Sequence, residues 1–143
     1  MTQASSILVV DDDMELGRYA ADVCRDAGHD ALNVVTPFEA LEVLARRPIQ
    51  LVITDVRMPE MDGVELIARI KSTTPEVAIV AVTAFGSFEV AERAIRAGAY
   101  DYLAKPFKPE ELLLRVGRAL ERREMALELA RLRQMVSQQL GKK

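Results

Sequence analysis

Residues 51–63, L-V-I-T-D-V-R-M-P-E-M-D-G, decide how the rest of the chain is interpreted. The first four are apolar or β-branched, which favours a strand buried on both faces. Asp55 follows where that strand should end, and Pro59 stops any regular continuation because proline lacks an N–H group. Asp62 and Glu65 have the spacing of a helix N-cap and its reciprocal acid. Asp55 is therefore expected on a short loop at the mouth of a strand, where ligands bind in open α/β sheets.

The remainder of the chain alternates between short apolar runs and amphipathic stretches with helical periodicity. This alternation, with strands apolar on both faces, predicts a parallel sheet covered by helices on both sides. The expected fold class is α/β: a flavodoxin-like, doubly wound, five-stranded parallel sheet of order 2-1-3-4-5 with an extended C-terminal helix. The strands are expected at residues 7–10, 31–35, 51–54, 77–82 and 99–104.

Charge and composition argue against several classes of function. The net charge is −3, but residues 1–109 carry −6 and residues 110–143 carry +3. An acidic globular part is a poor match to nucleic acid, so direct binding of DNA or RNA by this chain is not expected. No apolar run reaches membrane-spanning length and the N-terminus has no export signal, so no membrane partner is expected. A single cysteine, Cys24, fits a reducing cytoplasm, which is the location we expect.

Polar or charged residues end four of the five expected strands. They are Asp11 and Asp12 after the first strand, Asp55 after the third, Thr83 after the fourth and Lys105 after the fifth. These strands are neighbours in the order 2-1-3-4-5, and the carboxyl ends of parallel strands share one edge of the sheet. The topology therefore gathers three carboxylates, a hydroxyl and an ammonium group at one place.

Such a cluster suits phosphoryl chemistry. Carboxylates this close raise each other's pKa, and a hard cation such as Mg²⁺, which prefers oxygen ligands and keeps several waters, relieves the repulsion. Asp55 alone has room to react, and a carboxylate can attack phosphorus to form an aspartyl phosphate. Lys105 and the Thr83 hydroxyl are placed to compensate the phosphoryl oxygens, and the small Ala84 leaves a path for a donor.

Four stretches resemble the receiver domain of two-component response regulators. They are I-L-V-V-D-D-D (7–13), T-D-V-R-M-P-E-M-D-G (54–63), A-V-T-A (81–84) and G-A-Y-D-Y-L-A-K-P-F (98–107), and they keep the family's order and spacing. The runs D-V-R-M-P and A-F-G-S-F-E-V-A are most similar to receivers of enhancer-binding, nitrogen-regulation-type transcription activators. No ATPase module or helix-turn-helix follows in this chain, which is therefore either a receiver cut from a longer regulator or a stand-alone receiver with a helical tail.

The resemblance implies that the chain is a signalling switch rather than an enzyme. It implies that Asp55 takes a phosphoryl group from a histidine kinase. It also implies that Mg²⁺ is held by Asp11, Asp12, Asp55 and the backbone carbonyl of Arg57.

The resemblance also implies how the signal spreads from Asp55. Lys105 becomes the phosphate partner together with Thr83 and Ala84, and Thr83 and Tyr102 become the switch pair. Phosphorylation would then change the face made by the fourth helix, the fifth strand and the fifth helix, and with it the arrangement of a dimer. A cis peptide bond between Lys105 and Pro106 is a further expectation.

The C-terminal part predicts one long helix. Between Glu110 and Leu140 only Gly117 disfavours a helix, at a cost of about 1 kcal/mol. We divide the chain into a receiver domain at residues 1–120 and a helical tail at residues 121–143. An apolar seam with 4-3-4 spacing predicts a short coiled coil between two parallel copies, hence a homodimer, and its members are Met125, Leu129, Leu132 and Val136. A frayed, partly disordered tail is the alternative.

Other functions fit parts of the pattern. An Asp-nucleophile phosphohydrolase usually has a second acid two residues after the nucleophile, and here that position is Arg57. A pseudo-receiver that only dimerises would lack key site residues, whereas each is present here. A flavodoxin-like cofactor carrier needs a phosphate at its first loop, which Asp11 and its acidic neighbours would repel. We also interpret His29 as an exposed loop residue, and Arg57 and Phe85 as groups that influence water access to the site.

Overall fold

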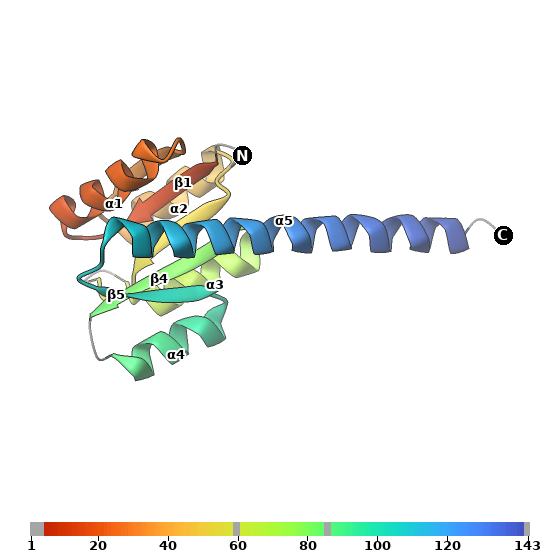
Figure 1. Cartoon of the computed structure of the whole chain (residues 1–143). Coiled ribbons are helices and arrows are strands. Elements are labelled where there is room, and N and C mark those ends of the chain that lie inside the picture. Colours follow the sequence, from red (N-terminus) through yellow and green to blue (C-terminus); the bar gives the residue numbers. More distant parts are fainter. Residues whose placement is uncertain (1–4, 59–60, 85–86, 142–143) are drawn as a thin grey trace.

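The protein contains one five-stranded parallel sheet with the strand order β2-β1-β3-β4-β5 (Figure 1). The computed structural model describes residues 5–58, 61–84 and 87–141. Every pairing between neighbouring strands is parallel, so the predicted fold class and strand order are confirmed. The strands are β1 (Ser6–Val10), β2 (Asp30–Val34), β3 (Leu51–Asp55), β4 (Ala78–Ala84) and β5 (Asp101–Lys105).

Helices follow each strand and cover both faces of the sheet (Figure 1). They are α1 (Met14–Asp26), α2 (Pro37–Arg46), α3 (Gly63–Thr73), α4 (Phe88–Ala97) and α5 (Pro109–Leu140). One hydrophobic cluster joins the sheet to α1 and α5, and a second joins it to α2, α3 and α4. In β1 the side chains of Ile7 and Val9 enter the first cluster, while Leu8 and Val10 enter the second. This alternation explains why the strands are apolar at every position.

The start of α3 fixes the loop that follows Asp55. The Asp62 carboxylate accepts a hydrogen bond from the Val64 N–H at 2.9 Å, which confirms Asp62 as the N-cap. The expected reciprocal contact from Glu65 does not form, because the Glu65 carboxylate pairs with Arg69 one turn further along the helix, at 3.0 Å. Asp62 also pairs with Arg93 of α4 at 3.2 Å, so this residue ties the loop to a second helix.

His29 is buried, so its interpretation as an exposed loop residue is wrong. Its side chain lies in the turn between α1 and β2, where Nδ1 accepts a hydrogen bond from the Ser5 N–H at 3.1 Å. Burial lowers the pKa of His29, which favours the neutral ring that can accept this bond. The imidazole therefore links the residue before β1 to the turn after α1. This structural contact lies at the amino edge of the sheet, whereas the predicted acidic residues follow the carboxyl ends of the strands.

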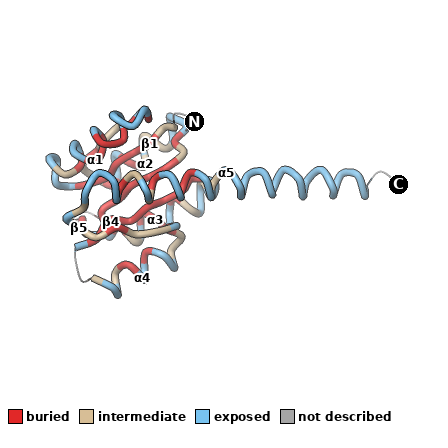
Figure 2. The backbone as a smooth tube through the Cα atoms, in the orientation of Figure 1, coloured by how far each residue is buried: buried red, intermediate tan, exposed pale blue. Residues whose placement is uncertain are grey.

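Helix α5 is a single helix of 32 residues that packs on the sheet and then continues beyond it (Figure 1). Its buried residues end at Leu120, and the expected seam residues Met125, Leu129, Leu132 and Val136 are all exposed (Figure 2). None of the helices in the described ranges combines the length and apolar character needed to cross a membrane.

Gly63, the first residue of α3, lies against the strand that carries Asp55. A Cβ atom at this position would lie 2.4 Å from the Val56 Cα and 2.5 Å from the Asp55 carbonyl oxygen. Both neighbours are backbone atoms, which cannot rotate away as a side chain can. The absence of a side chain at residue 63 therefore lets α3 begin directly against the end of β3.

We predict that Gly63→Ala lowers the free energy of unfolding by about 1–3 kcal/mol, because the methyl group forces the backbone of α3 away from β3. Gly117→Ala is the matched control, since a Cβ there meets no atom within 4 Å beyond the backbone of its own helix. This control should raise stability by roughly 0.5–1 kcal/mol, the usual gain for replacing a glycine inside a helix. Urea denaturation measures both, and equal effects of the two variants would contradict the close approach at Gly63.

Candidate functional site

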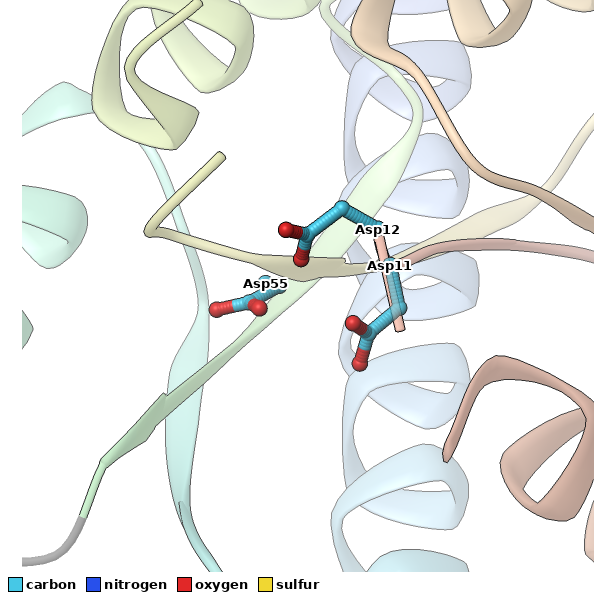
Figure 3. A group of neighbouring side chains, drawn as sticks. All are labelled: Asp11, Asp12 and Asp55. Carbon is cyan, nitrogen blue, oxygen red and sulfur yellow. The ribbon is translucent and has the colours of Figure 1, made fainter. Parts of the chain in front are cut away.

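Three carboxylates meet at the carboxyl edge of the sheet (Figure 3). Asp55 is the last residue of β3, and Asp11 and Asp12 directly follow β1, the neighbouring strand. Each residue contributes an oxygen to a set that lies within 4.8 Å. Asp11 and Asp55 are buried, whereas Asp12 is exposed. The predicted gathering of acids is thus present, with one member open to solvent.

Lys105 supplies a positive charge at the centre of the cluster. Its Nζ lies 3.0 Å from Asp11 Oδ2 and 3.2 Å from Asp55 Oδ2, so the side chain reaches from β5 past the end of β4. Burial opposes the charged form of this lysine, but hydrogen bonding to Asp11 and the attraction of both carboxylates outweigh burial and raise the pKa of Lys105. The ammonium group therefore stays charged and offsets part of the acidic repulsion.

Backbone N–H groups orient the two buried acids. The Asp13 N–H donates to Asp11 Oδ1 at 2.9 Å, and the Arg57 N–H donates to Asp55 Oδ1 at 3.1 Å. Burial raises the pKa of Asp11, against the opposing effects of the Asp13 N–H and Lys105. In both residues, Oδ1 is held by the chain and Oδ2 faces the lysine.

Thr83, Ala84 and Tyr102 lie on the two strands beyond β3. Thr83 is buried and Ala84 is exposed at the end of β4, where Ala84 is paired in register with Lys105. Tyr102 is half-buried in β5 and packs against the cluster shared with α2, α3 and α4. Because Thr83 lies two residues after Ala81, a member of the same cluster, Thr83 and Tyr102 occupy the same face of the sheet.

The remaining expectations have mixed outcomes. Arg57 is exposed on the loop after Asp55, and Phe85 lies outside the described residues. The peptide bond between Lys105 and Pro106 is cis, as the resemblance implied.

A cavity of about 550 Å³ lies beside the site between the loop and α4, and its lining residues are Val56, Arg57, Met58, Asp62, Val90 and Arg93.

Sequence inspection did not find the contacts of Arg115. The Arg115 Nε on α5 donates to the Tyr102 carbonyl at 3.2 Å and pairs with the Asp101 carboxylate at 3.2 Å. The Tyr102 N–H donates to Asp101 Oδ1 at 2.8 Å, so the backbone of Tyr102 is held on both sides. Helical periodicity could have placed Arg115 beside the apolar face of α5, but it carries no information about which strand residue an arginine contacts.

The donors fit a hard divalent cation. Carboxylate oxygens from three residues lie close enough to share one ion, and the exposed side of Asp12 leaves room for water ligands. Mg²⁺ prefers oxygen ligands and retains several waters, which matches a shallow cluster better than a closed cage. Receiver domains generally bind Mg²⁺ at an acidic cluster of this kind.

Comparison with known proteins identifies the family. The response regulator receiver domain family matches residues 7–117. The chain is 41% identical over 115 residues to the response regulator protein FleR of Pseudomonas aeruginosa, covering 80% of this chain and 24% of that protein. It is 35% identical over 133 residues to the C4-dicarboxylate transport transcriptional regulatory protein DctD of Rhizobium meliloti, covering 93% of this chain and 29% of that protein.

Solved structures agree with the sequence matches. NtrX from Brucella abortus in complex with ADP superimposes with a TM-score of 0.88 at 36% identity, over 91% of this chain and 30% of NtrX. A CheY-like receiver domain protein from Methanospirillum hungatei superimposes with a TM-score of 0.81 at 27% identity, over 87% of this chain and 99% of that one.

The chain therefore belongs to the response regulator receiver domain family, a class of signalling modules rather than classical enzymes. The relatives are response regulators of the enhancer-binding class, as the wording of the motifs predicted. The chain spans 24–30% of the length of the curated relatives it matches.

Lys105→Met should lower the free energy of unfolding by about 1–3 kcal/mol in a metal chelator, because two buried carboxylates lose their only described cationic partner. Adding Asp11→Asn should restore at least half of that loss, since it removes one of the uncompensated charges.

Urea denaturation measures the effect of the Lys105 variants, with Lys108→Met as the control at an exposed neighbouring lysine. The control should leave stability within about 0.5 kcal/mol of the parent. Equal stabilities for Lys105→Met and Lys108→Met would show that the central ammonium group contributes nothing to the fold.

Proposed function

We propose that Asp55 is the phosphoacceptor of a two-component system and takes its phosphoryl group from a phosphohistidine of a histidine kinase. The observation that supports this most directly is the position of Lys105, whose Nζ lies between the Asp11 and Asp55 carboxylates. A buried acid alone would be a structural residue. An acid paired with a cation at the carboxyl edge of a parallel sheet has the surroundings that a transferred phosphoryl group needs.

In the transfer, an oxygen of Asp55 attacks phosphorus while the bond from phosphorus to the histidine nitrogen breaks. The leaving nitrogen keeps the electron pair of that bond, and the ring departs as a neutral imidazole because its other nitrogen has taken a proton from solvent. Lys105 and the Thr83 hydroxyl then donate to phosphoryl oxygens, and Ala84 leaves space beside them. The candidate magnesium ligands are Asp11, Asp12, Asp55 and the carbonyl of Arg57. When bound there, Mg²⁺ would supply further positive charge to the phosphoryl oxygens.

The proposed switch follows from the side chains next to the acceptor. Once Thr83 turns toward the phosphoryl group, it vacates space on the sheet face that it shares with Tyr102. The face of α4, β5 and α5 then changes. Helices α4 and α5 already expose the apolar side chains of Phe88, Ile95 and Leu114. The hydrogen bond from Arg115 to the Tyr102 carbonyl holds the backbone of this residue, so the proposed movement is limited to the tyrosine side chain.

We also propose that residues 1–120 form the receiver and that residues 121–143 form a helical tail that joins two parallel copies. The tail seam supports this because Met125, Leu129, Leu132 and Val136 are 45–62% exposed in the single chain. A water-exposed stripe of this kind is favourable when a second helix covers it. We place the protein in the cytoplasm, with a histidine kinase as donor and with no nucleic acid or membrane bound by this chain.

The alternative functions have less support. An Asp-nucleophile phosphohydrolase usually has a second acid two residues after the nucleophile, and here the exposed Arg57 occupies that position. A pseudo-receiver that only dimerises has no need for a lysine between two buried carboxylates.

Asp55 should gain one phosphoryl group when the protein is incubated with acetyl phosphate and Mg²⁺. Intact-mass measurement should show the adduct in the parent and in Asp26→Asn, an exposed control on α1, but not in Asp55→Asn or in a chelator. An adduct that persists in Asp55→Asn would contradict the assignment of the acceptor. Rapid consumption of acetyl phosphate without an adduct would support the phosphohydrolase instead.

The tail proposal predicts that the full chain is a dimer and that a chain ending at Glu121 is a monomer, as measured by light scattering. Leu129→Gln should weaken the dimer because it places an amide in the apolar seam. Leu127→Gln is the matched control, since Leu127 is also exposed but lies on the opposite side of the helix. Equal masses for the full and shortened chains would remove the seam from the account.

A further inference from the structure

Helix α5 continues well beyond the residues that it buries against the sheet. Its last buried residue is Leu120, and from Glu121 to Leu140 every residue is exposed apart from the partly buried Arg123 (Figure 2). Twenty further residues of helix would extend about 30 Å. A tilt of about 10° at the base of such a helix would move its tip by about 5 Å. The contacts at the base therefore decide where the tail points.

Two consecutive arginines make contacts at this base. The Arg122 guanidinium carbon lies 5.9 Å from the centre of the Tyr100 ring, and the Arg123 Nε donates to the Glu76 carbonyl at 3.1 Å. Tyr100 precedes β5 and Glu76 precedes β4, so the helix is attached to two separate turns at the amino edge of the sheet. We define the exit corner as the region formed by Arg122, Arg123, Tyr100 and the turn at Glu76.

The two turns of the exit corner are braced against each other. The Lys71 Nζ donates to the Pro75 carbonyl at 3.0 Å and to the Val77 carbonyl at 2.6 Å, which closes the turn around Glu76. The aliphatic part of Lys71 also packs under Gly98, where a Cβ would lie 2.5 Å from Lys71 Cγ. The positive φ of 127° at Gly98 favours glycine as well. Movement of one turn is therefore passed to the other.

The exit corner is also connected to α4. Gly98 is the C-cap of α4, and the helix begins at Phe88, four residues after Ala84 at the end of β4. A rigid displacement of α4 would be passed along the helix and would reach Tyr100 through Gly98 and Ala99, the two residues between them. A cavity of about 440 Å³ at the exit corner, lined in part by Tyr100, Arg122 and Leu127, leaves room for such a displacement.

We propose that the Tyr100–Arg122 contact couples the position of α4 to the direction of the tail, so that phosphorylation of Asp55 changes where the exposed part of α5 points. This rests on the proposed function of Asp55 and adds a route of transmission to it. Arg122 is a positioning residue in this scheme. The Arg123 contact with Glu76 keeps the helix attached while the Tyr100–Arg122 contact adjusts its tilt.

The test measures distances between spin labels in the full chain. Labels are attached at Glu42→Cys on α2 and Gln134→Cys on the tail in a Cys24→Ala background, and a large excess of unlabelled protein removes distances between copies. Both label positions are exposed, whereas Cys24 is buried. Arg122→Gln removes the guanidinium. Arg118→Gln is the matched control, because Arg118 is exposed one turn earlier and has no ion-pair partner among the described residues.

Without a phosphodonor, Arg122→Gln should broaden the distance distribution relative to the parent and Arg118→Gln. With acetyl phosphate and Mg²⁺, the parent and Arg118→Gln should shift their mean distance, and Arg122→Gln should lose at least half of that shift. Tyr100→Leu, which removes the other side of the contact, should behave like Arg122→Gln.

Intact mass on the same samples separates this proposal from the function of Asp55. If the adduct forms and the parent shows no shift, or if Arg122→Gln behaves as Arg118→Gln does, the coupling is overturned. If no adduct forms in the parent, the proposed function fails. The widths of the unmodified distributions then decide whether the exit corner sets the direction of the tail, with equal widths overturning it.

Discussion

The structure depends on an electrostatic balance at one edge of the sheet, where the ammonium group of Lys105 lies between the carboxylates of Asp11 and Asp55. Both acids are buried, and like charges at this separation would repel strongly without a cation. The strand order makes the balance possible. Because β3 lies between β1 and β4, and β5 follows β4, residues that are 94 positions apart in the chain meet at one point. At this edge Asp11, Asp55 and Thr83 are buried, whereas Asp12 and Ala84 are exposed to solvent.

Sequence alone predicted this arrangement well because it follows from two strong patterns. Strands that are apolar on both faces and alternate with helices specify a doubly wound sheet, and the residues that end each strand must then lie together. Asp11, Asp12, Asp55, Thr83 and Lys105 were all found in this way. Their proposed roles come from the resemblance to receiver domains. Membership in that family supports these roles as a set and does not test the role of each residue.

Contacts between side chains of distant elements were beyond prediction. The pairing of Arg115 with Asp101, of Arg93 with Asp62 and of Arg122 with Tyr100 each joins a helix to another element, and no periodicity specifies such partners. Glu65 illustrates the same limit within one helix, since it had the spacing for an N-terminal cap yet pairs with Arg69. The burial of His29 was also not predicted. Nothing in the sequence around this single histidine indicates that its ring accepts a hydrogen bond from the distant Ser5 N–H. Of these pairs, the contact between Arg122 and Tyr100 carries the proposed coupling of α4 to the tail.

The most direct test of the account is a crystal structure of the full chain with Mg²⁺ and beryllofluoride, which mimics a phosphoryl group on an acceptor carboxylate. The account predicts beryllofluoride on Asp55, with the Lys105 Nζ and the Thr83 hydroxyl within hydrogen-bonding distance. It also predicts a cation that contacts at least two of the carboxylates of Asp11, Asp12 and Asp55. Beryllofluoride on another residue, or a cation bound away from these three acids, would contradict it.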